Sequence, residues 1–381
     1  MNIPIKLKND VITPPSGYVF PFIDKEDMQL KAKLSDGIII NYTSVNEDMK
    51  VISLSEYTAF EVMPNKKIIT SGTVDDKTGL TYSIDIPVCT THKFTLRSSN
   101  PVEDNDVVID WGDGTVEAIK NGKYKWISNK NYELSHDYSK SMKYNVQRFI
   151  IKIYGNNYYT FRHNSYENNN LISRIFTEDL PIASHIGNLA SAAIHSKRLL
   201  KVHFPHSTTP YSNVWNWSYT FSCCENLQSV LGFEDIMLRG DAYYDGFMNE
   251  CVNLKTTDFV IPSSATSLKG IFDGDINLEC DIEKILPLNG FSSSNILIKN
   301  VFNKTKIYGT IPSEKLWGDK NINWKFEGTS NMPFSGCSDE ILSQVPKSWG
   351  GFVDDSNINL TVEERLESIE SILKDHDFLV L

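Results

Sequence analysis

The chain has 381 residues and a mass of 43.3 kDa, a length that corresponds to about two or three domains. Apolar residues make up 40% of the sequence, so the chain can bury hydrophobic cores and does not have the composition of a disordered tail. Its formal net charge of −11 argues against nucleic-acid binding and against a polybasic membrane-surface protein, since both depend on clustered positive charge.

The N-terminal residues lack the apolar stretch of a signal peptide, and no apolar run approaches the ~18 residues of a membrane-spanning helix. We therefore expect neither an export signal nor membrane insertion. The cysteines form no Cys-x-x-Cys pair, so we expect reduced thiols and no zinc site. They are Cys89, Cys223, Cys224, Cys251, Cys280 and Cys337. An extracellular destination remains open for a protein that leaves the cell inside a virion released by lysis.

Residues 1–46 are the first expected segment. They contain an apolar run that ends at Asp24, a turn at residues 35–37 and a further strand-like piece at 38–40. The run consists of Tyr18, Val19, Phe20, Phe22 and Ile23. Two or three short strands are too few to bury a core, so we expect the segment to pack against another chain. A hairpin folded onto the next domain is the alternative.

Two β-containing segments are expected next. Residues 47–80 carry strand-like pieces at 50–54 and 67–70, which predict a connector with some β structure. Residues 81–156 contain short strand-like runs at near-even spacing, with Asp113 and Gly114 between two of them as a hairpin signal. This pattern predicts a β-sandwich with Trp111 buried in its core.

Residues 157–357 contain a repeat. A phenylalanine, once replaced by isoleucine, recurs at intervals of 24 to 30 residues and is followed six or seven positions later by another apolar or aromatic residue. The pairs are Ile194 and Leu200, Phe221 and Leu227, Phe247 and Leu254, Phe272 and Leu278, Phe302 and Tyr308, and Phe326 and Met332. Periods of this length predict a solenoid whose stacked units bury these anchors as ladders.

Residues 358–381 are expected to form one C-terminal amphipathic helix. Thr361 and Glu364 have the spacing of a capping box, and the apolar residues that follow lie on one face. We expect this face to cap the end of the solenoid, with self-association as the alternative.

No sequence motif of nucleotide-binding, metalloprotease or serine hydrolase sites is present. We therefore expect no enzymatic activity, no cofactor and no metal. Asp110, Asp113 and Glu117 are expected to stabilise a turn, with a calcium site or a glycosidase carboxylate pair as the less favoured alternatives. Three histidines are expected on a repeat edge rather than at a metal. They are His195, His203 and His206.

The aromatic residues of the repeats are more numerous than small core ladders require. Exposed aromatic side chains are typical of glycan stacking and of binding hot spots. The candidate binding surface consists of Trp215, Trp217, Tyr219, Tyr243 and Tyr244, with Tyr158 and Tyr159 as further candidates. The alternative is that half of these residues belong to the core.

The hairpin and two later pieces resemble the PKD-type immunoglobulin-like domain. In that family a Trp-Gly-Asp-Gly turn joins two strands, as at residues 111–114 here, and His-x-Tyr and Tyr-x-Val pieces follow, as at 136–138 and 144–146. Residues 121–131 are an insertion relative to that pattern. The resemblance implies an adhesive or spacer module without catalysis.

The repeat at residues 219–230 resembles the BspA-like leucine-rich repeat, whose core is approximately Met-Phe-x-x-Cys-x-x-Leu-x-x-Leu. Phe221, Cys224 and Leu227 match this core, whereas Asp275 and Thr305 stand where later units would have cysteine. The unit that begins at Phe247 carries one extra residue. The resemblance implies a leucine-rich-repeat solenoid that recognises proteins or glycans at a surface.

The N-terminal sequence resembles the opening of phage fibre and head-fibre proteins. Those begin with Pro-x-Ser-Gly-Tyr-Val, a short strand that ends in Asp, a lysine-rich strand and an Asp/Asn-Gly turn, as in residues 14–37 here. The resemblance implies that residues 1–46 attach a trimeric fibre to the virion.

Together these features predict a mainly β virion structural protein that is assembled in the host cytoplasm. A head fibre is favoured over a tail fibre because the chain is short and has no long shaft. We expect a homotrimer that contacts capsid or tail proteins and presents its repeats to a host-surface glycan or protein, or to other virion proteins. The alternative is a bacterial surface adhesin, and a glycan depolymerase is less favoured.

Overall fold

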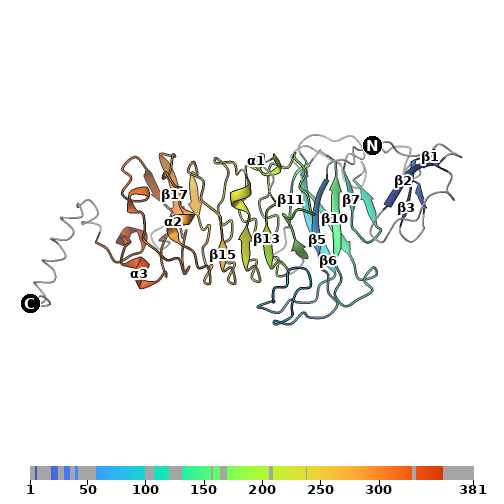
Figure 1. Ribbon diagram of the computed structural model, residues 1–381, viewed down its shortest axis with the longest axis horizontal. Coiled ribbons are helices and arrows are strands. Elements are labelled where there is room, and N and C mark those ends of the chain that lie inside the picture. Colours follow the sequence, from blue (N-terminus) through green and yellow to red (C-terminus); the bar gives the residue numbers. More distant parts are fainter. Residues whose placement is uncertain are drawn as a thin grey trace, which may run out of the picture.

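The computed structural model of the chain describes four N-terminal strands and residues 57–98, 107–119, 131–155, 158–163, 170–205, 209–236, 238–327 and 332–354 (Figure 1). The protein is mainly β, with 29% of residues in strands and only short helices, which confirms the expected class. Within the described ranges, no helix has the length and apolar character needed to cross a membrane.

The N-terminal strands form a sheet of their own. Its order is β1-β2-β3-β4, with β1 parallel to β2 and the other pairs antiparallel. The strands are β1 (Ile5–Lys6), β2 (Val19–Asp24), β3 (Leu30–Leu34) and β4 (Ile39–Asn41). Val19, Phe20, Phe22 and Ile23 of the expected anchor lie in β2, and Tyr18 lies outside the described residues.

Two antiparallel sheets face each other in the next part of the chain. The first has the order β12-β5-β10-β7-β8 and the second β11-β6-β9. Their strands are β5 (Tyr57–Val62), β6 (Thr91–Ser98), β7 (Val108–Asp110), β8 (Val116–Ala118), β9 (Asn131–Asp137), β10 (Phe149–Tyr154), β11 (Tyr158–Arg162) and β12 (Ile172–Arg174). Phe60 of the first sheet packs 5.8 Å from Phe94 and 5.4 Å from Phe161 of the second, between ring centroids. The core therefore lies between the sheets.

The two sheets draw strands from outside the expected range 81–156. β5 comes from the expected connector, and β11 and β12 come from the segment assigned to the repeats. β5 lies between β12 and β10, and every residue after Tyr57 in it is buried. A strand that is buried on both faces lacks the apolar–polar alternation that marks a half-exposed strand, which is why its sequence gave a weak signal. Residues 50–54 lie outside the described residues.

The hairpin between β7 and β8 has the expected turn. Trp111 is buried and packs 5.5 Å from Phe94, and its N–H donates to the Thr115 carbonyl at 3.0 Å. Gly112 and Gly114 both have positive φ values, +80° and +92°. The prediction of a buried Trp111 beside a turn at Asp113 and Gly114 is confirmed.

Replacing Gly112 by alanine should destabilise the protein more than replacing Gly114. Both substitutions strain the left-handed backbone by about 1 kcal/mol. A Cβ at Gly112 would also meet the Ile150 carbonyl oxygen at 2.4 Å, whereas a Cβ at Gly114 meets nothing within 4 Å. We expect Gly112→Ala to cost about 1 kcal/mol more than Gly114→Ala in urea unfolding. Equal losses for the two variants would contradict this tight approach of the hairpin to β10.

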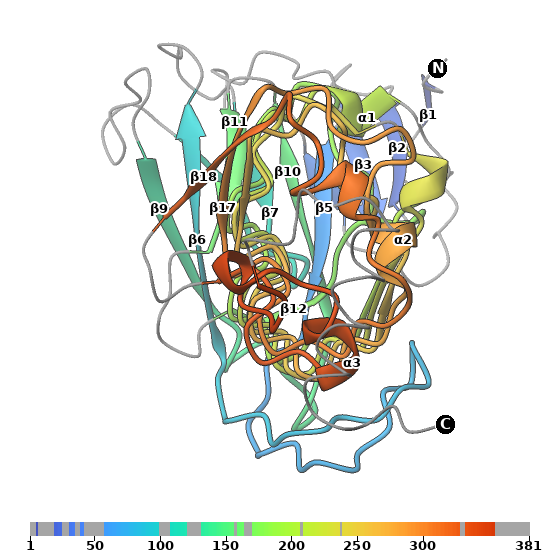
Figure 2. The same ribbon diagram turned by 90° about the vertical axis from the view of Figure 1, so that its left-hand side faces the viewer.

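The remaining described residues wind into a β-solenoid of about four turns, in which strands of successive windings pair in parallel (Figure 1). One row is β13-β14-β15 and the other is β16-β17-β18. The strands are β13 (Lys201–His203), β14 (Ser229–Leu231), β15 (Thr256–Thr257), β16 (Ser267–Lys269), β17 (Asn295–Lys299) and β18 (Asn323–Phe326). The helices are α1 (Thr209–Ser212), η2 (Phe233–Asp235), α2 (Ile282–Ile285), η3 (Ser313–Lys315), α3 (Asp339–Leu342) and η4 (Lys347–Trp349). Figure 2 looks along the solenoid and shows β17 and β18 on one side and α2 on the other.

One type of loop recurs along the solenoid, and its backbone hydrogen bonds hold neighbouring windings together. In each copy, two residues four positions apart have left-handed φ values. The pairs are Ser191 and His195, Tyr219 and Cys223, Gly246 and Glu250, Gly270 and Gly274, and Asn300 and Lys304. The residue midway between them donates its N–H to the next winding, as Phe221 does to Phe247 at 3.0 Å and Phe272 to Val301 at 3.1 Å. These bonds satisfy backbone groups that the stacking buries.

The central residue of each loop is buried in a continuous core, as the repeat predicts. These residues are Ala193, Phe221, Met248, Phe272 and Phe302, with Phe334 at the corresponding position of the last winding, and the expected partners Leu227, Leu254 and Leu278 are buried with them. Phe247 is buried too, but Met248 occupies the central position. The spacing from Met248 to Cys251 then equals that from Phe221 to Cys224, so the expected extra residue in this unit is not present.

Three expected anchors, Tyr308, Phe326 and Met332, are not fully buried in the structure, and Met332 is partly buried. Phe326 is 38% exposed and Tyr308 52% exposed, and the buried positions belong to Phe334 and Ile307 instead. The last two central residues, Phe302 and Phe334, are 32 residues apart, so a period taken from the earlier units places the last anchor at Phe326 instead of Phe334.

The first unit is shifted by one residue. Ile194 is only partly buried, and Ala193 takes the central position with Leu199 as its buried partner. Leu200 packs instead in a second cluster, formed with residues that follow β5. The helix expected over residues 358–381 lies outside the described residues.

Candidate binding face

Three of the five aromatic side chains of the candidate binding surface are exposed. Trp215, Tyr219 and Tyr243 have exposed fractions of 37%, 45% and 50%. Trp217 and Tyr244 are buried, so their assignment to a binding surface is wrong. We call the three exposed rings the aromatic face.

Trp217 is buried although it lies only two residues from the exposed Trp215. A continuous strand would place Trp215 and Trp217 on the same side. Here the backbone enters the recurring loop, whose first left-handed residue is Tyr219, and the indole of Trp217 enters the core. Its ring lies 5.8 Å from those of Phe204 and Phe247.

Tyr244 is held in the core at both ends of its side chain. Its ring lies 5.6 Å from that of Phe259, and its hydroxyl donates to the Arg239 carbonyl at 2.8 Å. Burial raises the pKa of this phenol well above its usual value. Tyr158 is also buried, whereas Tyr159 is half-buried beside the aromatic face.

The rings of Trp215 and Tyr243 stand next to each other on neighbouring windings. Their centroids are 6.3 Å apart and their planes meet at 80°. The Tyr243 N–H donates to the Trp215 carbonyl at 3.0 Å, and the Trp217 N–H donates to the Tyr243 carbonyl at 2.8 Å. The stacking of the windings therefore sets the spacing between the two rings.

Two glycines let the exposed rings lie close to the backbone. A Cβ at Gly187 would be 3.2 Å from both Cδ1 and Nε1 of Trp215, and a Cβ at Gly246 would be 2.3 Å from Cε1 of Tyr219. Each ring thus packs on a neighbouring winding with one side, Trp215 on the preceding one and Tyr219 on the following one, while the other side remains in solvent. A ring held in this way loses little conformational freedom when a ligand stacks on it.

Charged side chains flank the aromatic face at both ends. The Arg97 guanidinium lies 5.6 Å from the centroid of the Tyr159 ring. At the other end Lys269 lies 3.4 Å from the Asp245 carboxylate and 3.6 Å from that of Glu327. Since Lys269 belongs to β16, the face continues along the side of the solenoid that carries β17 and β18 (Figure 2).

The acidic hairpin holds its carboxylates in protein hydrogen bonds. Asp110 accepts from the Gly112 N–H at 2.9 Å, and Asp113 accepts from the Thr115 N–H at 3.0 Å, from Ser141 and from His136 Nε2 at 2.8 Å. Burial alone would raise the pKa of Asp113, but the bonds from Ser141 and His136 outweigh it and lower that pKa to about 2. This arrangement agrees with the expected turn-stabilising role.

The remaining candidate residues do not come together in one site. His195 is half-buried at a left-handed loop position, His203 is exposed, and His206 lies outside the described residues. Across the described ranges, no group of three His, Cys, Asp or Glu side chains is arranged to hold a metal ion. Glu117 lies in β8 and pairs with Ile109, so it lies on the opposite face of the hairpin from Asp110.

No known protein family matches the chain, and neither a curated protein nor a solved structure does. The residues that support the aromatic face were not identified from sequence. Gly187 and Gly246 stand one winding away from the rings they support, and only the stacking of windings relates such positions.

Proposed function

We propose that the chain is a phage virion fibre, with a head fibre favoured over a tail fibre, that binds a host surface through its solenoid. The binding role is supported by the aromatic face, whose three exposed rings are held in place by backbone bonds between windings. Rigid, exposed aromatic side chains are typical of binding hot spots. The virion assignment rests on the fibre-like sequence of residues 14–37, and we propose a homotrimer attached to capsid or tail proteins.

We further infer that the two-sheet unit is a PKD-type immunoglobulin-like domain. The sequence pieces that carry the resemblance meet in space: His136 bonds to Asp113, and the Tyr138 hydroxyl donates to the Trp111 carbonyl at 2.9 Å. We also infer that the solenoid is of the BspA-like leucine-rich class. Its support is the buried series of central residues with Cys224, Cys251 and Cys337 three positions later.

Alanine at Trp215, Tyr219 and Tyr243 together should weaken binding of the full chain to host cells by tenfold or more, about 1.4 kcal/mol, because the stacking rings are lost. Binding would be measured with fluorescently labelled protein on intact host cells. Tyr144→Ala is the matched control, since Tyr144 is an exposed tyrosine of the two-sheet unit. Circular dichroism should show that both variants are folded. Equal binding by the triple variant and the control would contradict the role of the aromatic face.

The anchor is tested separately. A chain without residues 1–46 should still fold but should be missing from purified virions, because the segment would no longer dock on its partner proteins. Immunoblots of virions that carry the full or the shortened chain would measure this. Normal incorporation of the shortened chain would contradict the anchor assignment, and absence of the full chain from virions would contradict the fibre assignment.

A further inference from the structure

The solenoid opens on the side opposite the aromatic face. The opening between the windings of β15 and α2 is flanked by two backbone bonds: Glu279 N–H to the Lys255 carbonyl at 3.1 Å, and Ile261 N–H to the Ile285 carbonyl at 2.8 Å. Among the described residues, no backbone bond joins 256–260 to 280–284, which lie between these two points. β15 is the edge strand of its row, and the windings part there to form a groove of about 760 Å³.

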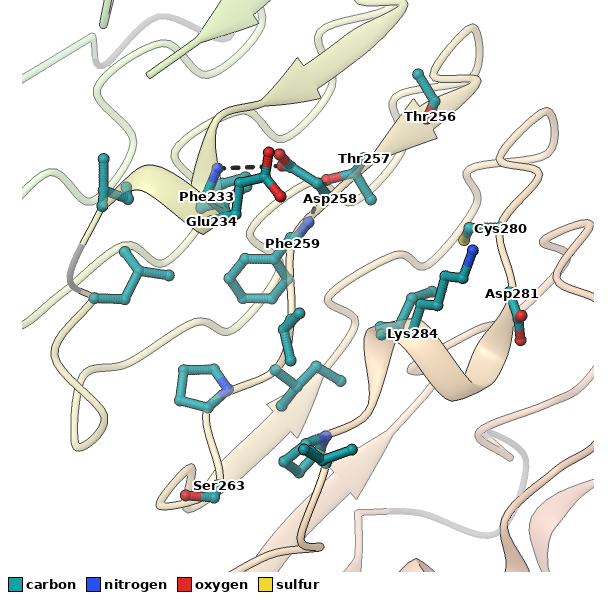
Figure 3. Close-up of a pocket in the computed structure, with 18 of the residues that line it drawn as sticks. Phe233, Glu234, Thr256, Thr257, Asp258, Phe259, Ser263, Cys280, Asp281 and Lys284 are labelled. Carbon is teal, nitrogen blue, oxygen red and sulfur yellow. Dashed lines mark hydrogen bonds between the residues drawn. The ribbon is translucent and has the colours of Figure 1, made fainter. Parts of the chain in front are cut away.

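The groove has an apolar base and an acidic rim. Phe259 and Ile285 are buried at its base, and Figure 3 shows Glu234 and Asp258 on one wall and Lys284 and Asp281 on the other. Glu279 also lines it, so the lining residues include four carboxylates and one ammonium group, and the Asp281 carboxylate caps α2 by accepting from the Glu283 N–H at 3.1 Å. The rim therefore repels anions.

One carboxylate of the rim is fixed by the backbone. Asp258 accepts hydrogen bonds from the Gly232 N–H at 2.7 Å and the Phe233 N–H at 3.3 Å. The bound carboxylate retains further lone pairs, which can accept a hydroxyl donor from the groove. Tyr308 adds an exposed ring, whose backbone is held by bonds to Cys280 and Ile282, both at 3.0 Å.

The groove is closed at both ends, and this favours a short ligand over a peptide strand. A peptide strand that paired with β15 would have to continue along the row, where the bonds from Glu279 and Ile261 block its path. A short ligand with an apolar face and several hydroxyl donors fits the chemistry better. A pyranose ring has both, because its C–H face can stack on Tyr308 and its hydroxyls can donate to carboxylates, which form strong charge-assisted bonds.

We propose that this groove binds a short oligosaccharide that carries no acidic groups. Its volume lies within the usual range for small-ligand sites, about 300–1,000 Å³. The site is distinct from the aromatic face, because it lies on the α2 side of the solenoid (Figure 2). The inference does not depend on how the chain is attached to a virion.

Ligand-observed NMR and calorimetry on the full chain would test the groove. The neutral probes are maltotriose, cellotriose and chitotriose, and trigalacturonate is the acidic probe. We expect at least one neutral trisaccharide to bind, and Tyr308→Ala to weaken that binding about tenfold or more. Tyr308→Phe should bind as the native chain does, because it keeps the ring.

Tyr144→Ala is the matched control, since it removes an exposed tyrosine of the two-sheet unit that belongs to neither the groove nor the aromatic face. It should leave trisaccharide binding unchanged. If Tyr243→Ala loses trisaccharide binding and Tyr308→Ala does not, the groove is not the oligosaccharide site, and the result supports binding at the aromatic face instead. The proposal is also overturned if no neutral probe binds at millimolar concentration, or if trigalacturonate binds best.

Discussion

Replacing Arg198 by methionine should lower the free energy of unfolding by about 2–4 kcal/mol. Arg198 is a buried residue of the first solenoid winding. Its Nε donates to the Met63 carbonyl at 2.8 Å, and its terminal nitrogens donate to Asn170, Pro87 and Asn65. Methionine keeps an apolar side chain of similar length but leaves these buried acceptors without their donor. Arg198 thus joins the residues after β5 to the solenoid.

The neighbouring lysine provides the control. Lys197 forms a partly exposed surface ion pair with Glu225 at 3.1 Å, and such surface pairs contribute about 0–1 kcal/mol. Urea unfolding of Arg198→Met and Lys197→Met, followed by circular dichroism, would compare a fully buried charge with a surface charge at adjacent positions. If both variants unfold at the same urea concentration as the native chain, Arg198 does not connect the two parts of the fold.

The sequence predicted the parts of the fold that depend on local spacing. Phe221, Leu227, Phe272 and Leu278 recur at a period that buries one residue of each winding, and they are buried. The turn after Trp111 was predictable for the same reason, since a two-strand hairpin is formed by residues close in sequence. Phe334 was missed because the last windings are longer than the earlier ones.

An asparagine series was a further signal that the sequence contained. Asn226, Asn253 and Asn277 each precede a buried leucine of the repeat. Their side-chain amides donate to carbonyls of the preceding winding, at 2.8, 2.7 and 2.8 Å. The recurring Asn-Leu pair would have placed these units in register without reference to the phenylalanines.

The direction of individual side chains could not be predicted at the loops. Trp215 and Trp217 differ only in their distance from the left-handed Tyr219, and one is exposed while the other is buried. The groove beside β15 was also not predictable. It depends on the absence of backbone bonds between 256–260 and 280–284 in the described part of the chain, and no residue type at Thr256 or Thr257 signals that absence.

A buried acid interrupts the row of small residues inside the solenoid. The residue three positions after each central residue is buried, and the series is Ser196, Cys224, Cys251, Asp275, Thr305 and Cys337. Cys224 and Cys251 donate their thiols to carbonyls of the preceding winding at 3.1 and 3.0 Å. Asp275 accepts from the Cys251 N–H at 2.7 Å through Oδ1, whereas Oδ2 has no hydrogen-bond partner among the residues that the structure describes. Burial raises the pKa of Asp275 well above its usual value.

Replacing Asp275 by cysteine should therefore stabilise the protein, by about 2 kcal/mol near neutral pH, because it removes an unsatisfied buried carboxyl group. The pKa of Asp275 is raised in the folded chain, so the folded state holds a proton that the unfolded chain releases above about pH 4. The stability of the native chain then falls as the pH rises above that value. The gain from Asp275→Cys should be larger at pH 8 than at pH 5, measured by urea unfolding with reductant present.

Thr305→Cys, at the next position of the same row, is the control. Thr305 already donates to the Phe302 carbonyl at 2.8 Å, so this variant should change the stability little at either pH. A pH-independent or negative effect of Asp275→Cys would show that the carboxyl group is paired and charged in the folded protein.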